Sequence, residues 1–559
     1  MKKCLNAVLA VSVLVLILTS CNTANVAVDQ ELITIHVNQI GYLSSGYKSA
    51  IVIGSGDRFV IVNETTQQAV YKGQLSEPAY WDASGETVRI AEFSDFETSG
   101  VYHIQVAGQS SYPFEISGTV YADVATASLK AFYFHRVGMA LEEEYAGVYA
   151  RPAGHPDTAI TVHASAATAL RPAGSVISSP KGWYDAGDYN KYIVNSAITV
   201  GTMMSLYEHY PHLVNQVETN IPESSNETPD LLDEIRYNLD WMLTMQDPED
   251  GGVYHKLSSN KFGAMELPHL DLAPRLVVMK TTPAALDFAA IMAQASRVYR
   301  PFDLEFSNAC LNAAKRAWDW SSAHPTVHYA QPEDVVTGAY DQQTKDFEDE
   351  KFWAATELSL STGIVYEAQI PKPFIVPEWR NGAALAAMDQ LHHEVNKVVR
   401  LAFFVLADSL LNAQLNSAYD VSNDAFRWGS TSDFLNQAMV LSFAYKLSGN
   451  RVYMNAAQSS FDWVLGKNPN GYSFVTGYGD KTPLHIHHRP SEGDGVVEPI
   501  PGWVAGGPNP GNKYDCGEDL YLSAYPAKAY LDMLCSYGTN EVAINWNAAF
   551  VYVAFAVGS

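Results

Sequence analysis

The sequence predicts two folded domains in one chain, an all-β sandwich followed by a larger all-α domain. Short runs of β-branched and aromatic residues, separated by Gly, Ser, Asn and Asp, repeat over residues 30–117. From residue 118 onward, apolar residues recur at the i, i+3, i+4 and i+7 spacing of amphipathic helices. With 559 residues, of which 47% are hydrophobic and 17% charged, the chain is long enough for two such domains and has a globular composition.

The first 20 residues are expected to be a signal peptide and not part of the fold. Two lysines precede the apolar run Leu5–Leu18, which is shorter than the roughly 20 residues of a typical membrane span. The four residues ending at Cys21, LTSC, resemble the lipobox of bacterial lipoproteins, in which Cys21 would be lipidated. A plain signal peptide that ends near a cysteine is the alternative. We therefore expect an exported protein of the bacterial cell envelope that touches the membrane only through a lipid anchor.

The β domain, residues 30–117, is expected to be an immunoglobulin-like sandwich. Seven short strand candidates at this spacing are typical of that architecture, and no cysteine pair bridges them. The candidates are residues 32–42, 48–54, 59–64, 68–75, 87–93, 100–106 and 111–116.

The all-α domain, residues 118–559, is expected to be an (α/α)6 barrel, because about a dozen helices in succession can pair and close into a ring. No Ser/Pro-rich linker separates it from the sandwich, so the two domains are expected to pack together. The helix candidates are residues 126–145, 195–210, 228–246, 282–299, 307–324, 351–362, 394–411, 430–449, 451–466, 523–536 and 540–556.

The charge balance restricts the partners. The formal net charge is -26, which argues against nucleic acid, whose phosphates need a basic surface. A neutral substrate fits this charge better than a polyanion.

The segment GWYDAGDYNKY places two carboxylates, Asp185 and Asp188, three residues apart among aromatic rings. Two carboxylates on one loop can orient a water molecule and take its proton as a general base. Taken alone, the spacing also fits an Asx-turn or helix cap, in which each aspartate would bind backbone N–H groups.

A second acidic candidate, Glu541, is expected at the start of the last helix with Asn540 as its cap. A plain helix start would give this carboxyl a low pKa, whereas a general acid needs a raised one from burial and nearby carboxylates. The sequence leaves both open. It also leaves open whether Cys516 and Cys535 form a disulfide.

Three histidines occur in four residues just before Arg489, in LHIHHR. Their spacing differs from the i, i+4 pattern of helical zinc sites, so hydrogen bonds to ligand hydroxyls are the favoured interpretation. Aromatic residues make up 12% of the chain, and several cluster near these motifs, where flat rings could stack on sugar faces.

Together these segments resemble glycoside hydrolase family 9, the inverting cellulase family, in its subgroup with an N-terminal immunoglobulin-like domain. SFVTGYGDKTPLHIHHR fits the family's histidine signature, with His487 and Arg489 at its key positions. YLDMLCSYGTNEVAINWNA fits the second signature, with Asp532 and Glu541 at its acidic positions, and GWYDAGDYNKY fits the family's DAGD loop.

The resemblance implies roles for individual residues. Asp188 would be the general base, Asp185 would help hold the attacking water, and Glu541 would be the general acid. Sugar hydroxyls would be bound by His487, Arg489 and Tyr537, and Trp428 would be a stacking platform. Asp349 and Glu350 match acidic residues that bind structural calcium in relatives, and no cofactor is expected for catalysis.

We therefore expect a monomeric, endo-acting enzyme that cleaves β-1,4-linked glucans with inversion, the substrate being cellulose-like, mixed-linkage or xyloglucan polymer or cello-oligosaccharide. An exo-acting β-glucosidase or glucosaminidase of the same family is one alternative. A non-catalytic glycan-binding lipoprotein is another, and the presence of Asp185, Asp188 and Glu541 argues against it.

Overall fold

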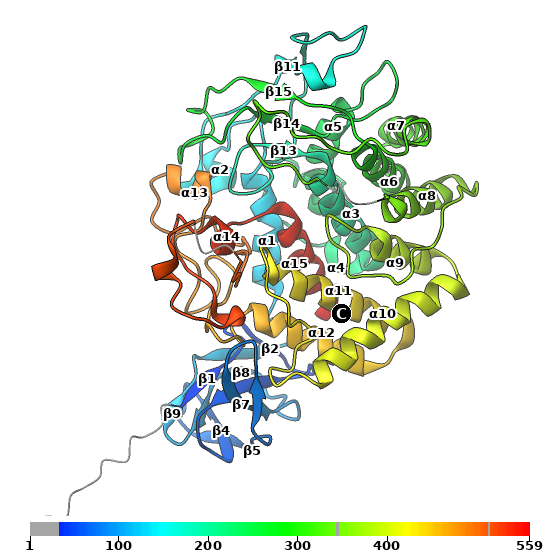
Figure 1. The fold of residues 1–559 in the computed structure, drawn as a ribbon. Helices are drawn as coiled ribbons and strands as arrows, with labels where there is room; N and C mark the ends of the chain where they lie inside the picture. The colour runs from blue at the N-terminus through cyan, green and yellow to red at the C-terminus, as the bar shows by residue number, and fades with distance from the viewer. Residues whose placement is uncertain (1–32, 342–345, 512–514, 559) are drawn as a thin grey trace, which may run out of the picture. The chain divides into compact units, whose positions relative to one another are not determined.

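The computed structural model describes residues 33–341, 346–511 and 515–558 (Figure 1). The expected signal peptide and Cys21 lie outside these residues. The N-terminal part is built from β1 (Thr34–His36), β2 (Gly41–Leu43), β3 (Ser49–Ile53), β4 (Arg58–Asn63), β5 (Ala69–Gln74), β6 (Ala79–Trp81), β7 (Glu86–Glu92), β8 (Gly100–Val106), β9 (Gln109–Ser110) and β10 (Phe114–Ser117).

These strands form two sheets with a shared apolar core. One sheet has the order β1-β3-β7-β6, and the other has the order β2-β10-β8-β4-β5, with β9 paired to β8. Alternate residues of the central strands point inward, so Val52, Ile61, Ile104 and Ile116 are fully buried in this core. The expected strand 32–42 is divided in two, because the Asn38 side chain accepts hydrogen bonds from the next backbone N–H groups and turns the chain. β6 was not expected.

The sandwich packs against the helical domain through both polar and apolar contacts. The Asn38 amide donates to Asp462 at 2.8 Å, and Lys467 donates to the Ser49 hydroxyl at 2.9 Å. Trp81 lies 4.4 Å from Tyr419, ring centre to ring centre. This contact agrees with the absence of a linker in the sequence.

The rest of the described chain is mostly helical. Its longer helices are α1 (Ala122–Phe134), α3 (Ile193–His209), α5 (Asp230–Thr244), α6 (Thr282–Val298), α7 (Leu304–Ala323), α8 (Glu348–Thr362), α9 (Ala383–His393), α10 (Lys397–Leu415), α11 (Ser430–Ser448), α12 (Arg451–Val464) and α15 (Ile544–Val557). Short helices are α2 (Glu143–Ala146), α4 (Pro211–Val214), α13 (Arg489–Gly493) and α14 (Tyr537–Asn540).

Several helices begin where the sequence supplies a cap. The Thr281 hydroxyl accepts from the Ala284 N–H at the start of α6, and the Asn396 side chain accepts from two N–H groups at the start of α10. α3 and α15 are buried nearly all round, as their apolar sequences require. By length and composition alone α10 could cross a membrane, which was not expected, but it packs on α9, α11 and α12.

Four expectations about the helices are corrected. The candidate 126–145 ends as α1 at Phe134, because the chain then pairs with residues 182–184. The candidate 523–536 contains only the 3-10 turn Pro526–Lys528. The last helix starts at Ile544 and not at Asn540, and α9 was missed.

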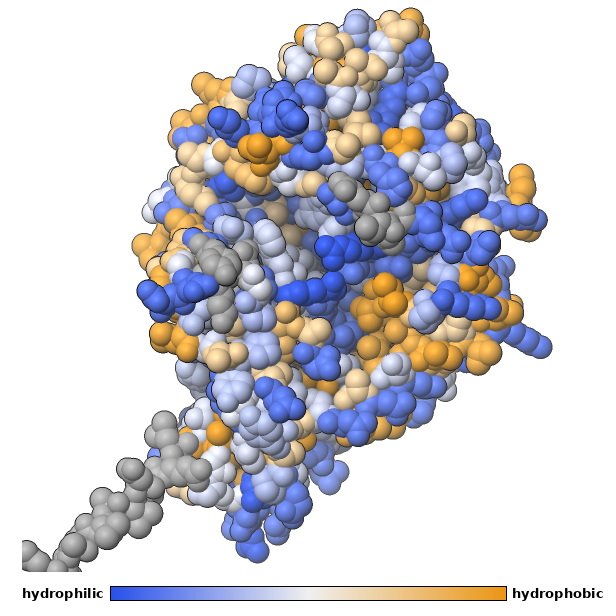
Figure 2. Space-filling model, in the orientation of Figure 1, coloured by the Kyte–Doolittle hydropathy of each residue, from blue (hydrophilic) through white to orange (hydrophobic). Residues whose placement is uncertain are grey.

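A further small sheet in the helical domain also escaped prediction. It has the order β12-β11-β15-β14-β13 and is built from β11 (Ile160–Val162), β12 (Val176–Ile177), β13 (Lys191–Tyr192), β14 (Lys256–Ser259) and β15 (Arg275–Val277). β13 leads directly into α3, and this sheet fixes the end of the segment that contains Asp185 and Asp188. On the face seen in Figure 2, hydrophilic side chains gather around a hollow near the middle of the helical domain.

Candidate active site

The loop with Asp185 and Asp188 lies between β12 and β13 and is held by the segment after α1 and by α15. Residues just after α1 pair with it, as the Tyr184 N–H donates to the His135 carbonyl at 2.9 Å. On the other side, the Asp185 carbonyl accepts from the Ile544 N–H at 2.9 Å, which ties the loop to the first turn of α15. The two aspartates therefore do not cap a helix. They project from a braced loop.

Each of the two carboxylates has its own hydrogen-bond donors. Asp185 accepts from the Asn195 amide and from the Tyr340 hydroxyl, both at 2.8 Å. Asp188 accepts from the Asn190 amide and, at 3.3 Å, from the Tyr192 hydroxyl. Both aspartates are buried. These donors fix the orientation of the two carboxyl groups, which are largely shielded from bulk solvent.

Glu541 lies opposite this loop on an extended stretch between α14 and α15. Its backbone is bridged to His487, and the neighbouring Ala543 is bridged to Ala186. The residue at 187 must be glycine here. A Cβ atom on Gly187 would lie 2.0 Å from the His487 carbonyl oxygen and 3.2 Å from Glu541 Oε1. The segments around Gly187, His487 and Glu541 can thus approach this closely only because glycine has no side chain.

Burial and nearby carboxyl groups raise the pKa values of Asp185 and Glu541. Burial, with a further contribution from Asp188, raises the pKa of Asp185 to about 8. Burial also raises the pKa of Glu541 well above its ordinary value, and the charges of Asp188 and Asp185 add to this, against the opposing effect of Arg489. This raised pKa favours the protonated form of Glu541, the form that a general acid needs. A plain helix start would have lowered the pKa of this carboxyl.

One cleft of about 770 Å³ joins the predicted site residues. All three predicted catalytic carboxylates and all four predicted sugar-binding residues line it: Asp185, Asp188, Glu541, His487, Arg489, Tyr537 and Trp428. The Trp428 ring is 49% exposed and lies 5.4 Å from the Tyr537 ring, which is 37% exposed. Two half-exposed rings side by side at a cleft wall suit the apolar face of a sugar.

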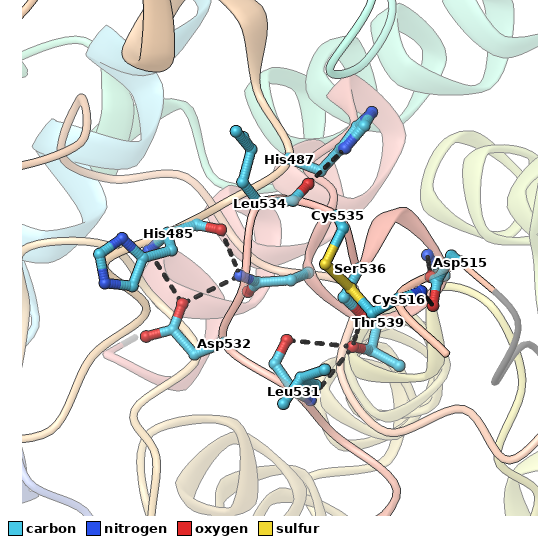
Figure 3. The surroundings of a disulfide bond; sticks show 12 residues. His485, His487, Asp515, Cys516, Leu531, Asp532, Leu534, Cys535, Ser536 and Thr539 are labelled. Carbon is cyan, nitrogen blue, oxygen red and sulfur yellow. Dashed lines mark hydrogen bonds between the residues drawn. A yellow bond between two sulfur atoms is a disulfide. The ribbon is translucent and has the colours of Figure 1, made fainter. Parts of the chain in front are cut away.

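His487 and Arg489 help to build the cleft as well as to line it. The Arg489 guanidinium donates to the Gly187 carbonyl at 2.7 Å, and the Arg489 N–H donates to the same oxygen at 3.1 Å. His487 Nδ1 lies 2.7 Å from the Leu534 carbonyl oxygen (Figure 3). Burial lowers the pKa of His487, so its ring is neutral near pH 7 and can donate from one nitrogen and accept at the other.

Asp532, the other acidic residue of the second signature, is not among the residues that line the cleft. Its carboxylate accepts from the backbone N–H group of His485 at 2.9 Å (Figure 3). It also accepts from the Leu484 N–H and from the Asn540 amide, each at 2.9 Å. Asp532 therefore joins the loop that contains His485 and His487 to the segment that precedes Glu541.

Several cleft residues were missed by the sequence reading. Tyr340, Tyr192 and Trp379 form a ring cluster beside Asp185, with Tyr340 5.0 Å from each of the other two. Arg427 also lines the cleft, where it bonds Asp433 at 2.7 Å. Tyr192 ends the GWYDAGDYNKY motif and Arg427 directly precedes Trp428, whereas for Tyr340 and Trp379 the aromatic content of the loops was the only signal.

The residues suggested for calcium lie outside the cleft. Asp349 and Glu350 are buried in the first turn of α8. Within the described residues, no group of three or more His, Cys, Asp or Glu side chains is placed to hold a metal ion. Ca²⁺ takes six to eight oxygen ligands, which can include backbone carbonyls and water besides carboxylates, so these two residues would supply part of a site.

The fold and the cleft define a candidate glycoside hydrolase. Comparison with known proteins gives the family: the model of Glycosyl hydrolase family 9 matches residues 121–554, and that of the cellulase N-terminal ig-like domain matches residues 31–111. The chain belongs to glycosyl hydrolase family 9.

Relatives of full length support this assignment. A xyloglucan-specific endo-beta-1,4-glucanase, BoGH9A of Bacteroides ovatus, is 42% identical, and the match covers 93% of each chain. Endoglucanase D of Acetivibrio thermocellus is 32% identical over 93% of this chain and 82% of its own. A solved structure described as Bacteroides ovatus GH9 superposes with a TM-score of 0.86 at 40% identity, covering 94% of this chain and 98% of that one. A metagenome-derived family 9 endoglucanase has the same TM-score at 32% identity, covering 94% and 99%.

Proposed function

We propose that the protein is an endo-β-1,4-glucanase that cleaves its glucan with inversion at the anomeric carbon. The observation that carries this proposal is the meeting of Asp185, Asp188 and Glu541 in one aromatic-walled cleft. Endoglucanases at 32–42% identity over most of the chain support the endo mode and the β-1,4 linkage.

In this proposal one carboxyl group acts as the general base and another as the general acid. Asp188 takes a proton from the attacking water, while Asp185 helps to hold that water. Glu541, kept protonated by burial and by its acidic neighbours, gives its proton to the glycosidic oxygen. Inverting enzymes place the two functional carboxyls about 6.5–9.5 Å apart so that water fits between base and sugar.

The remaining cleft residues bind the sugar chain. His487, Arg489 and Tyr537 donate to or accept from hydroxyl groups near the scissile bond, and Trp428 stacks on a sugar face. The buried donors of Asp185 and Asp188 keep both carboxylates oriented before substrate arrives. Such preorganisation contributes to catalysis because little rearrangement remains at the moment of reaction.

Among β-1,4-glucans we propose xyloglucan as the preferred polymer, on the strength of the 42% identical relative that carries this specificity in its name. Initial rates on xyloglucan, carboxymethyl cellulose, mixed-linkage glucan and cellohexaose test this directly. Xyloglucan should give the highest kcat/KM, with a fast fall in viscosity. Release of monosaccharide alone would indicate exo action, and binding without new reducing ends would indicate a glycan-binding protein.

We also propose that the helices close into an (α/α)6 barrel. α15 packs on α3, α3 on α6, α6 on α8, α8 on α9, α9 on α11, and α11 again on α15. This closed sequence of contacts supports the ring, which would bring loops from several helices to one end.

Three further proposals concern the setting of the enzyme. We propose that it is a monomer, that Cys21 anchors it by lipid in the bacterial cell envelope, and that calcium binds near Asp349 and Glu350. Labelling of the protein with a radioactive fatty acid in cells tests the anchor, and the label should be lost in Cys21→Ser.

The calcium proposal is tested by thermal melts. Calcium should raise the melting temperature of the wild type but not of Asp349→Asn, and an equal response of both would exclude that site.

A further inference from the structure

A disulfide lies in the segment that carries the Leu534 carbonyl and the cleft residue Tyr537. Cys516 and Cys535, 19 residues apart in sequence, are bonded, with their Cα atoms 5.2 Å apart (Figure 3). Cys535 follows Leu534 and precedes Tyr537 by two residues, so the bond sits in the segment that supplies both a carbonyl to His487 and a ring to the cleft.

The Leu534 carbonyl determines which ring nitrogen of His487 carries the proton. This oxygen can only accept, so at 2.7 Å it selects the tautomer of His487 that carries the proton on Nδ1. Because the neutral ring has one donor and one acceptor, Nε2 is left as a hydrogen-bond acceptor. The His487 N–H is held separately by the Asn540 carbonyl at 2.9 Å, so the backbone of the residue stays in place even when its ring is free.

The Leu534 carbonyl itself is held by what flanks it. On the N-terminal side of Leu534, the Asp532 carboxylate accepts hydrogen bonds from the Leu484 and His485 N–H groups. These bonds tie the segment to the loop that carries His487. After Leu534, the disulfide joins Cys535 to Cys516, and the adjacent Asp515 carboxylate accepts from the Gly538 N–H at 2.9 Å. Ser536 completes the frame, with its hydroxyl 2.6 Å from that of Thr539. Among these interactions, the disulfide is the covalent link on the side of Leu534 that leads to Tyr537.

We propose that the Cys516–Cys535 disulfide is a positioning element for substrate binding: it holds the Leu534 carbonyl against His487 and thereby keeps the acceptor nitrogen of His487 turned toward the sugar. The proposal rests on the proposed role of His487 in sugar binding. Its consequence is that glucan binding depends on the redox state of the pair. Dithiothreitol would reduce the S–S bond to two thiols while being oxidised to its cyclic disulfide.

A purely structural disulfide would behave differently. Closing a loop of this length stabilises a protein mainly by restricting the unfolded chain. Its removal would then lower the melting temperature without a selective effect on His487. The two roles are therefore separated by measurements on the folded enzyme well below its melting temperature.

A double-mutant cycle gives the kinetic test. Cys516→Ser/Cys535→Ser should raise KM for cellohexaose about fivefold, the value of one net hydrogen bond, with a smaller change in kcat. In the His487→Ala background the same pair of substitutions should change KM less than twofold. Cys310→Ala, which removes the buried thiol of α7, is the matched control and should leave KM unchanged. Equal effects of the cysteine substitutions in both backgrounds would overturn the proposal.

A spectroscopic test works without turnover. In the wild type labelled with ¹⁵N-histidine, the His487 signals, identified by their loss in His487→Ala, should show a single Nδ1–H tautomer. Dithiothreitol should convert them to a mixture of tautomers in the folded wild type and change nothing in the double serine variant. A single unchanged tautomer after reduction would refute the proposal. This test holds even if β-1,4-glucans are not the substrate, and it can be read from the wild type, with His487→Ala for assignment, if the serine variant fails to fold.

Discussion

Gly187→Ala should separate the catalytic segments with a single added methyl group. The new Cβ would lie 2.0 Å from the His487 carbonyl oxygen, where a carbon and an oxygen in contact need at least about 3 Å. The loop must therefore shift by about 1 Å, and the Glu541 carboxyl, 3.2 Å from the same Cβ, lies in its path. A misplacement of about 1 Å costs about 100-fold in rate, so we expect kcat to fall by about that factor. Overpacking of this kind also costs about 1–3 kcal/mol of stability.

The assay is steady-state kinetics on cellohexaose with a thermal melt of each variant. Gly118→Ala is the matched control, because a Cβ there meets nothing within 4 Å and the backbone is not left-handed. It should leave both kcat and the melting temperature near wild type. A Gly187→Ala enzyme that is folded and within threefold of the wild-type kcat would refute the claim that this approach sets the active geometry.

Three other predictions follow from the cleft. Glu541→Gln should lower kcat by about 10²–10⁴ on cello-oligosaccharides but much less on dinitrophenyl cellobioside, whose leaving group needs no acid, and equal losses would contradict the role of Glu541. Because the pKa of Asp185 is raised to about 8 in the folded state, the folded protein retains a proton that the unfolded chain loses above about pH 4, so its unfolding free energy should fall between about pH 4 and 8. Asp185→Asn should therefore gain melting temperature relative to wild type as pH rises through that window, and a constant difference in calorimetry would count against the raised pKa. Trp428→Ala should raise KM about fivefold with kcat nearly unchanged, as expected for the loss of one aromatic contact, and a fall in kcat alone would argue against a platform role.

The sequence predicted the cleft better than it predicted the elements around it. Asp185, His487 and Glu541 lie in three short motifs, and a motif can be recognised without knowing how far apart its residues lie in space. Tyr340 and Trp379 belong to no such motif. Their place beside Asp185 depends on long-range packing, which single aromatic residues in loops do not reveal.

The errors in secondary structure have a common cause. Residues 523–536 have helical apolar spacing, yet the hydrogen bonds that the Asp532 carboxylate accepts and the disulfide at Cys535 hold them as a loop. Asn540 looked like a cap, but the Ile544 N–H bonds the Asp185 carbonyl, so the chain stays extended through Glu541. In both places tertiary hydrogen bonds override local propensity. The strands β11–β15 are two to four residues long, too short to show a period.

The central claim is that Asp188 and Glu541 act on opposite faces of the sugar, with water attacking directly. Proton NMR of cellohexaose during the first minutes of digestion tests it, because the new reducing end reports its configuration before mutarotation. Direct attack by water should give α-anomeric products of intermediate length. Early β-anomers would contradict the inverting mechanism and the roles assigned to both residues.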